Sequence, residues 1–288
     1  MQINIGGVPE HFNFPFHYAI IEKAKSDLGI TLHWQDYPGG TGAMCADLES
    51  NTLDIAIVLT EGIIAAISKG NPSKMVQWYV ESPLVWGIHV NSNSSIVHET
   101  DFVNKKYAIS RPGSGSHLMA YVNANNRGFQ LKETDFVVVG NLNGAVQALE
   151  AYEADLFMWE KFTTKPLVDN GAFRRVAECP TPWSCFAIAV SNLVLEKHPD
   201  VIANLIDLIT QVNSEMKAIE NLNELIAEKY GLKVEDVTSW LSSVQWKSDN
   251  TQVDPLIISG IIENLTKLHI IDNPISAASV LYQWKENC

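Results

Sequence analysis

A unit of glycine-containing turn, helix and apolar strand occurs twice in this sequence of 288 residues. In the first copy Gly42 opens the helix and Ile55–Leu59 is the strand. In the second copy Gly144 opens the helix and Leu156–Trp159 is the strand, and an aspartate directly precedes the strand in both copies. Such a repeat predicts two similar α/β domains. Because open α/β sheets bind ligands beyond the carboxyl ends of their strands, we expect a cleft between these domains.

The pattern of apolar residues changes after the second repeat. Strands and helices alternate up to Ser191, and from there onward the spacing of apolar residues is helical. We expect helices over Val201–Ile219, Leu222–Tyr230, Val234–Val244 and Leu256–Leu268. The sequence therefore predicts an α/β protein with a helical C-terminal region.

The composition excludes one class of partner and leaves another open. A formal net charge of −13 provides no cationic surface that could displace counterions from a nucleic acid. The chain is 46% hydrophobic and 18% charged, as expected for a folded protein with a large core. Backbone N–H groups can still bind an anion locally, whatever the net charge. We therefore expect no nucleic-acid partner, whereas an anionic small-molecule ligand is compatible with the composition.

The sequence leaves two compartments open. No apolar run is long enough to span a membrane, and Met1–Ile5 has the pattern of a strand rather than of a signal peptide. We expect the chain to be either cytoplasmic or a trimmed mature form, periplasmic or anchored outside the cytoplasm. The four cysteines show no zinc spacing, and although Cys179 and Cys185 could pair, we expect free thiols.

The turn Ser110–His117 has the features of an anion-binding site. It follows the short apolar run Tyr107–Ile109 and opens a helix, so several free backbone N–H groups and the positive end of the helix dipole meet there. Ser114 and Ser116 can cap the helix or donate hydroxyls to a ligand. Considered alone, the turn is better explained as an ordinary capped helix than as a binding site.

The order and spacing of several motifs resemble the solute-binding proteins of ABC transporters for nitrate, sulfonates, taurine and thiamine-precursor pyrimidines. The motifs are the Gly-Gly-Val-Pro loop after the first strand, Pro38–Gly42, Leu53–Ile57 with Thr60 and Glu61, Ala66–Gly70, Gly113–His117, Ala148–Ala151 and Lys197–Asp200. The resemblance implies the type II periplasmic-binding-protein fold. It implies a discontinuous domain I, residues 1–87 and 188–288, and an inserted domain II, residues 88–187. Two crossing strands, Val85–Asn91 and Cys185–Val190, would form the hinge.

The resemblance also implies which residues hold a ligand between the domains. Carried over position by position, the candidates are His11, Phe12, Phe14, Thr41, Thr60 and Glu61 on domain I, Ser114, Ser116, His117, Asn141, Trp159 and Glu160 on domain II, and Trp183 before the return crossing. It implies no catalytic residue, no metal and no cofactor.

The charges around these candidates indicate what kind of ligand fits. Relatives that bind nitrate are expected to place a basic residue in the cleft, whereas Arg111 and Lys161 are not clearly aimed inward. Helix N-termini favour negative charge, but the aromatic candidates suit an organic body. We expect a sulfonate-like or pyrimidine-like compound rather than nitrate or bicarbonate. A monomer would close around it on the hinge and present it to an ABC permease.

An enzyme on the same fold, of the menaquinone or thiamine-pyrimidine biosynthesis type, is the main alternative, and the absent export signal favours it. Against it, the loop Gly6–His11 lacks a Ser-Pro-Cys-Pro-Asn-Asp type of motif, and no cysteine-rich motif is present. Glu61 and Glu160 could form an acid/base pair across the cleft, although helix capping or contact with a ligand amine explains them as well. A stand-alone sensor domain is a third class, but no helix-turn-helix is attached.

Two further patterns suggest chemistry only weakly. Ser114 and His117 could belong to a catalytic triad, but geometry defines a triad and no nucleophile elbow is present. His11, His17 and Glu10 could bind a metal, but their spacing matches no common site.

Overall fold

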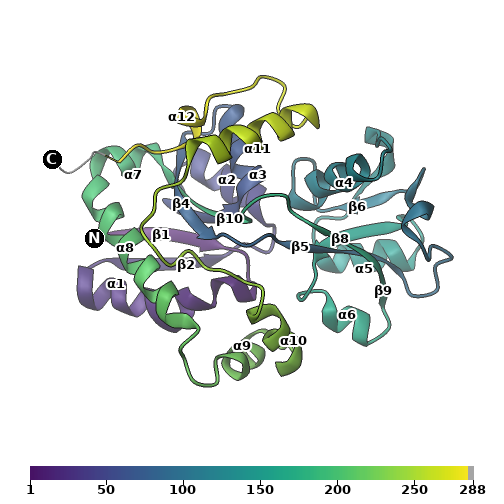
Figure 1. Ribbon diagram of the computed structural model, residues 1–288, viewed down its shortest axis with the longest axis horizontal. Helices are drawn as coiled ribbons and strands as arrows, with labels where there is room; N and C mark the ends of the chain where they lie inside the picture. Colours follow the sequence, from purple (N-terminus) through teal and green to yellow (C-terminus); the bar gives the residue numbers. More distant parts are fainter. Residues whose placement is uncertain (285–288) are drawn as a thin grey trace.

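The computed structural model describes residues 1–284 and contains two five-stranded sheets with helices packed on them (Figure 1). The strand order is β2-β1-β3-β10-β4 in the first sheet and β7-β6-β8-β5-β9 in the second. The repeated unit of the sequence supplies the central strand of each sheet, β3 (Ile55–Leu59) and β8 (Leu156–Glu160). The predicted two-domain α/β fold is confirmed.

The first sheet combines parallel strands with one returning strand. Its other strands are β1 (Gln2–Gly7), β2 (Thr31–Asp36), β4 (Ser73–Val80) and β10 (Phe186–Ser191), and its helices are η1 (His11–Asn13), η2 (Phe16–Ile20), α1 (Ile21–Leu28), α2 (Thr41–Glu49) and α3 (Thr60–Ser68). Strand β1 pairs in parallel with β2 and β3, and β10 lies antiparallel to β3 and β4. All five residues of β3 are apolar and buried, as expected for a strand inside a sheet covered on both faces.

The second sheet repeats this arrangement with a different set of strands. They are β5 (Val85–Asn91), β6 (Tyr107–Ile109), β7 (Phe136–Val138), β8 and β9 (Phe173–Pro180), and the helices are η3 (Glu99–Phe102), α4 (Gly115–Asn126), η4 (Glu133–Asp135), α5 (Leu142–Glu150) and α6 (Lys165–Asp169). Strand β6 is parallel to β7 and β8, and β5 is antiparallel to β8 and β9. Helix α5 precedes β8 in the chain and packs against it, as α2 precedes β3 and packs against it.

The C-terminal region returns to the first sheet. Its helices are α7 (Asn192–Lys197), α8 (Pro199–Met216), α9 (Leu222–Tyr230), α10 (Val234–Leu241), α11 (Pro255–Lys267) and α12 (Ala277–Val280). Helix α8 packs against α1, and α11 and α12 pack against α3. Lys233, just before α10, reaches Asp169 of α6 on the second sheet, with Nζ 2.7 Å from Oδ2. Of the helices in residues 1–284, none is both long enough and apolar enough to cross a membrane.

The two sheets are joined by two short connections, residues 81–84 and 181–185, which run side by side. Leu84 N–H donates to Thr181 Oγ1, Thr181 N–H donates to Leu84 O (both 2.9 Å), and Cys185 N–H donates to Ser82 O (3.3 Å). The whole of β5 lies in the second sheet and the whole of β10 in the first. We therefore propose domain boundaries inside these connections, slightly before the boundaries at residues 87 and 187 that the sequence suggested.

Candidate ligand-binding site

A small cavity lies where the two sheets face each other. Its volume is about 40 Å³. The first sheet and its loops contribute Val8, Glu10, Gly39, Gly40, Thr41, Leu59 and Phe186, the connection contributes Leu84, and the second sheet contributes Trp86, Ser110, Arg111, Ser114, Gly115, Ser116, Trp159 and Glu160. A neighbouring hollow of about 280 Å³ shares Val8, Glu10 and Trp159 with it. The cavity is therefore the narrow inner part of an interdomain cleft.

The N-terminus of α4 forms one wall of the cavity. Ser114 is its N-cap, and its Oγ accepts from the backbone N–H of His117 (3.4 Å). Ser116 Oγ accepts from Ser110 N–H (3.0 Å) and lies 3.1 Å from Ser114 Oγ. Both serines are buried. The turn is therefore a capped helix and also part of the cavity wall, so the two explanations of its sequence are compatible.

Arg111 extends from this turn across the cleft. Its guanidinium donates to the carbonyl of Gly39, in the loop before α2, and a Cβ added to Gly42 would lie only 2.6 Å from Arg111 Nη2. Nη2 is buried and has no hydrogen-bond partner within residues 1–284. Burial lowers the pKa of Arg111, but an arginine stays charged at neutral pH. The expectation that Arg111 is not aimed inward is wrong, because its side chain spans the gap between the domains.

Lys161, the other basic candidate, is bound elsewhere. Its Nζ lies 2.9 Å from Glu178 Oε1, at the edge of the second sheet, and it does not line the cavity.

Glu10 and Trp159 join the two domains across the cavity. The indole N–H of Trp159 donates to Glu10 Oε1 (3.1 Å). Burial, together with the nearby charge of Glu160, raises the pKa of Glu10 to about 8. The Glu10 carboxyl is therefore protonated for much of the time at neutral pH in this closed arrangement.

Glu160 is held at the end of β8 by the chain that follows it. Its Oε2 accepts from the backbone N–H groups of Phe162 (2.9 Å) and Thr163 (2.6 Å), and burial raises its pKa to about 7. His11 Nε2 lies 3.9 Å from the same oxygen. Because burial lowers the pKa of His11 to about 3, this contact joins a neutral imidazole to the carboxyl and is not an ion pair.

Four other candidates hold the start of α3 in place and offer no free polar group to the cavity. Thr41 lines the cavity, but its Oγ1 already accepts from Leu59 N–H (3.0 Å). Thr60 Oγ1 donates to Ser184 O (2.7 Å), and Trp183 Nε1 donates to Glu61 Oε2 (2.8 Å). These bonds connect the start of α3 to the connection 181–185, and Thr60, Glu61 and Trp183 do not line the cavity.

The aromatic loop after β1 turns into the core. Phe12 packs against Phe186 and Trp240, with ring centroids 5.0 and 5.3 Å away, and Phe14 stacks on Tyr18. Both phenylalanines are buried and neither lines the cavity. The structure therefore does not place Phe12 and Phe14 in the site, because Phe12 packs under Trp240 of α10 and Phe14 packs against Tyr18.

Asn141 and His117 lie at the two openings of the cleft. Asn141 caps α5 by accepting from Gly144 N–H (3.0 Å) and lines the 280 Å³ hollow. His117 Nδ1 accepts from Gly113 N–H (2.9 Å), and its ring lies against Phe136 in a hollow on the other side.

Several lining residues were missing from the sequence-based candidates, and the ones with a polar group on the side chain are Glu10, Trp86, Ser110 and Arg111. Arg111 had a visible signal, since it is the basic residue inside the turn already proposed to bind an anion. No comparable signal marks Trp86, because its position in the cleft depends on how the connections orient β5.

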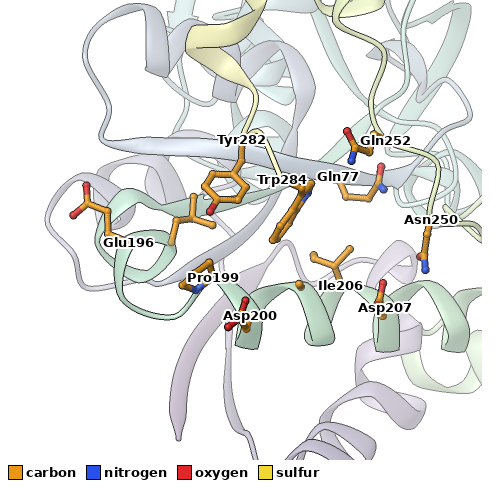
Figure 2. Close-up of a pocket in the computed structure, with 12 residues that line it drawn as sticks. Gln77, Glu196, Pro199, Asp200, Ile206, Asp207, Asn250, Gln252, Tyr282 and Trp284 are labelled. Atoms are coloured by element: carbon orange, nitrogen blue, oxygen red, sulfur yellow. The ribbon is translucent and has the colours of Figure 1, made fainter. Parts of the chain in front are cut away.

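A much larger hollow lies elsewhere, over the outer edge of the first sheet. Its volume is about 750 Å³, and Figure 2 shows Tyr282 and Trp284 from the C-terminal segment opposite Asp200, Ile206 and Asp207 of α8. None of the sequence-based candidates lines it. Within residues 1–284, moreover, no group of three histidine, cysteine or acidic side chains could hold a metal ion.

Each sheet has the strand order 2-1-3-n-4, in which n is the strand that follows a connection from the other sheet (β10 in the first sheet and β5 in the second). This strand order, with two connections and a cleft between the sheets, defines the type II periplasmic-binding-protein fold. A family model described as Ca3427-like PBP matches residues 86–179, which include all of the second sheet except Val85 and Pro180. No curated protein sequence matches the chain.

Solved structures extend the similarity to the whole chain. The Candida albicans CA3427 gene product, which defines a family with the generic periplasmic binding protein fold, is 28% identical, with a TM-score of 0.89 over 100% of this chain and 99% of that one. The alkanesulfonate-binding protein SsuA from Xanthomonas axonopodis pv. citri, bound to MOPS, is 14% identical, with a TM-score of 0.83 over 98% of each chain. PhnD1 from Prochlorococcus marinus, in complex with methylphosphonate, is 12% identical, with a TM-score of 0.62 over 94% and 99%.

Proposed function

We propose that this chain is the solute-binding component of an ABC import system and closes around a small organic anion between its two domains. The fold supports a binding role, and two of the similar structures hold a sulfonate or a phosphonate. Among the two ligand classes expected from the sequence, we favour the sulfonate-like one.

The observation that carries this proposal is the position of Arg111. Its guanidinium lies in the cleft between the start of α2 and the start of α4, and Nη2 is unpartnered. Guanidinium groups and helix N-termini both bind sulfonate, phosphate and carboxylate oxygens. An anionic group placed here would contact both domains at once and would therefore favour the closed state.

The apolar part of the lining favours an organic body. Leu59, Leu84, Trp86 and Trp159 surround the cavity beside the polar groups. A bare inorganic anion leaves these walls unused, whereas pockets with mostly apolar walls and a few polar groups suit small organic ligands. The cavity of about 40 Å³ is too small for such a molecule, so we expect the domains to move apart on the hinge for entry.

Replacing Arg111 tests this function. We expect Arg111→Ala to weaken binding of ethanesulfonate or MOPS about tenfold or more in calorimetric titrations, since a charged hydrogen bond contributes about 1.5–3 kcal/mol. Lys161→Ala is the matched control and should leave affinity unchanged. A ligand that binds the native state raises its melting temperature. A thermal-shift screen of sulfonates and nitrate therefore identifies the class of ligand. A shift with nitrate and none with any sulfonate would contradict the proposal.

The second candidate function is that of an enzyme on the same fold, because two buried carboxyl groups lie in the cleft. Glu10 and Glu160 line the cleft with pKa values raised to about 8 and about 7, the range of general acids and bases. Mass spectrometry of a sulfonate recovered after incubation with the protein separates the two functions. An unchanged compound supports binding, and a converted one supports catalysis.

A further inference from the structure

Helices α6 and α10 face each other across the gap between the two domains (Figure 1). Helix α6 follows β8 and packs against β9, so it belongs to the second domain. Helix α10 belongs to the first domain, because its Trp240 packs against Phe12 and Trp246, with ring centroids 5.3 and 5.4 Å away. Side chains that bridge these two helices therefore join parts of the chain that separate when the domains open on the connections.

Each side of this gap contributes one lysine and one aspartate. Lys233, just before α10, has its Nζ 2.7 Å from Oδ2 of Asp169 on α6. Lys165 of α6 also pairs with Asp169, and its Nζ lies 3.9 Å from Oδ2 of Asp236 on α10. The side chains of Lys165 and Asp236 are 29% and 16% exposed, so this crossing is partly shielded from water. Two positive and two negative charges thus form one network that spans the gap.

The helices themselves do not explain where these charges lie. A helix favours acidic side chains at its N-terminus and basic ones at its C-terminus. In α6 this order is reversed, because Lys165 is the first residue and Asp169 the last. Lys233 is likewise a basic residue at the N-cap of α10. Each of these three side chains is disfavoured within its own helix but has an opposite charge on the other helix, so contact between the domains accounts for their placement.

A further charge on the second sheet attracts α10 as well. Burial lowers the pKa of Arg175 on β9, whereas nearby carboxylates, Asp236 and Asp169 among them, oppose this decrease. An arginine stays charged at neutral pH, so Arg175 attracts Asp236 from across the gap. Neither Arg175 nor any member of the network lines the ligand cavity. The attraction between the domains at this point is therefore independent of a ligand.

We propose that Lys165, Asp169, Lys233 and Asp236 form an electrostatic latch that sets the balance between the open and closed arrangements of the two domains. The latch acts only in the closed arrangement, because opening on the connections separates α6 from α10. It raises the fraction of closed molecules in the ligand-free chain and slows the opening that must precede ligand release. Because its members are partly exposed, dissolved salt weakens it.

Charge reversals test the latch in the full, ligand-free chain. Lys233→Glu places a carboxylate against Asp169, and Asp169→Lys places an ammonium group against Lys233. Each should lower the ratio of closed to open molecules about threefold or more, seen as a larger radius of gyration in small-angle scattering at low salt. The double variant has two basic residues on α6 facing two acidic residues at α10. It should therefore be at least as compact as the wild type.

A matched control separates the latch from a general effect of charge. Lys267→Glu makes the same change in net charge and breaks an ion pair with Glu263 that lies within α11 alone. It should keep the radius of gyration of the wild type. Raising the NaCl concentration from about 20 mM to about 500 mM should expand the wild type. The same change should not expand Lys233→Glu, in which salt weakens a repulsion instead.

The scattering measurements need no ligand, so their outcome is separate from that of the proposed sulfonate-binding function. An unchanged radius of gyration in both single reversals, or no recovery in the double variant with the unfolding temperature intact, would overturn the latch. Stopped-flow tryptophan fluorescence with ethanesulfonate adds a kinetic readout. Dissociation should be about threefold faster from Lys233→Glu than from the wild type and unchanged in Lys267→Glu. Equal dissociation rates in Lys233→Glu and the wild type would also contradict the latch.

Discussion

Glu61 is a carboxyl that the chain buries completely at the first turn of α3. Its one side-chain hydrogen bond within the described residues comes from Trp183 Nε1, and its Oε1 is buried without a partner. Burial raises the pKa of Glu61 to about 7. The Trp183 N–H can donate to either form of this carboxyl, but burial makes the ionised form costly, so Glu61 is most favourable to the folded state while it is protonated.

The pH dependence of stability follows from this shift. A carboxyl with a raised pKa binds more protons in the folded than in the unfolded state, so the free energy of unfolding falls as the pH rises. For Glu61 the loss begins near the unfolded pKa of 4.5, proceeds as the pH rises towards about 7 and levels off above that value. Glu10 and Glu160 add to it in the same direction.

We therefore expect urea denaturation to show a lower free energy of unfolding at pH 8 than at pH 5. Glu61→Gln should make this difference smaller, because glutamine does not titrate. The exposed Glu49→Gln on α2 serves as the comparison and should leave the difference as it is. If the wild-type protein became more stable between pH 5 and pH 8, the buried carboxyls would not dominate the pH dependence of its stability.

At the scale of elements, α4 depends on two serines with different functions. Ser114 is the N-cap, and losing such a cap costs about 1 kcal/mol. Ser116 satisfies the buried N–H of Ser110 at the end of β6. Removal of its hydroxyl leaves that donor unpaired, which costs about 1–3 kcal/mol. The helix start is thus joined to the strand before it as well as to the cleft.

Single substitutions separate these contributions. We expect Ser116→Ala to lower the free energy of unfolding at least as much as Ser114→Ala, measured by chemical denaturation. Ligand affinity should fall in both variants, because both serines line the cavity. Ser259→Ala on α11, far from the cleft, provides a hydroxyl control. If either cleft variant keeps full affinity with the fold intact, that serine acts only in the helix cap.

At the scale of the whole molecule, Gly115 is a position where the two domains pack closely against each other. A Cβ at this position would lie 2.5 Å from Leu59 Cδ1 of the first sheet and 2.8 Å from Trp86 Cη2 of the second. The contact with Leu59 exists only while the domains are closed. A larger residue at this position would have to displace Leu59 or Trp86 in the closed state, and the contact with Leu59 arises only between the two domains.

We expect Gly115→Ala to hold the domains apart and to weaken ligand binding about tenfold, with little change in the unfolding temperature of the ligand-free protein. Small-angle scattering should show a smaller radius of gyration when the wild type binds its ligand, and less compaction in the variant. Gly260→Ala, in open space on α11, should leave compaction unchanged and raise stability by about 0.5–1 kcal/mol. Equal compaction of Gly115→Ala and wild type would contradict this account of closure.

The sequence by itself determined the elements and their repetition. Strand β5 has the predicted bounds, and β10 begins one residue later than predicted. The start of α4 was also predictable, because a Gly/Ser turn between a strand and a helix is a local signal. Local patterns suffice for these features, since backbone conformation and hydrogen bonding within a turn depend on near neighbours.

Only the tertiary structure decided which side chains face the cleft. Phe12 is buried against Trp240 of α10, over two hundred residues away in sequence, and Arg111 crosses to Gly39 because the connections bring α2 opposite α4. The raised pKa of Glu10 likewise depends on its burial in the closed cleft and on the charge of Glu160 from the other domain. Side-chain direction and charge coupling depend on distances between residues far apart in the chain, and those distances exist only once the two domains close.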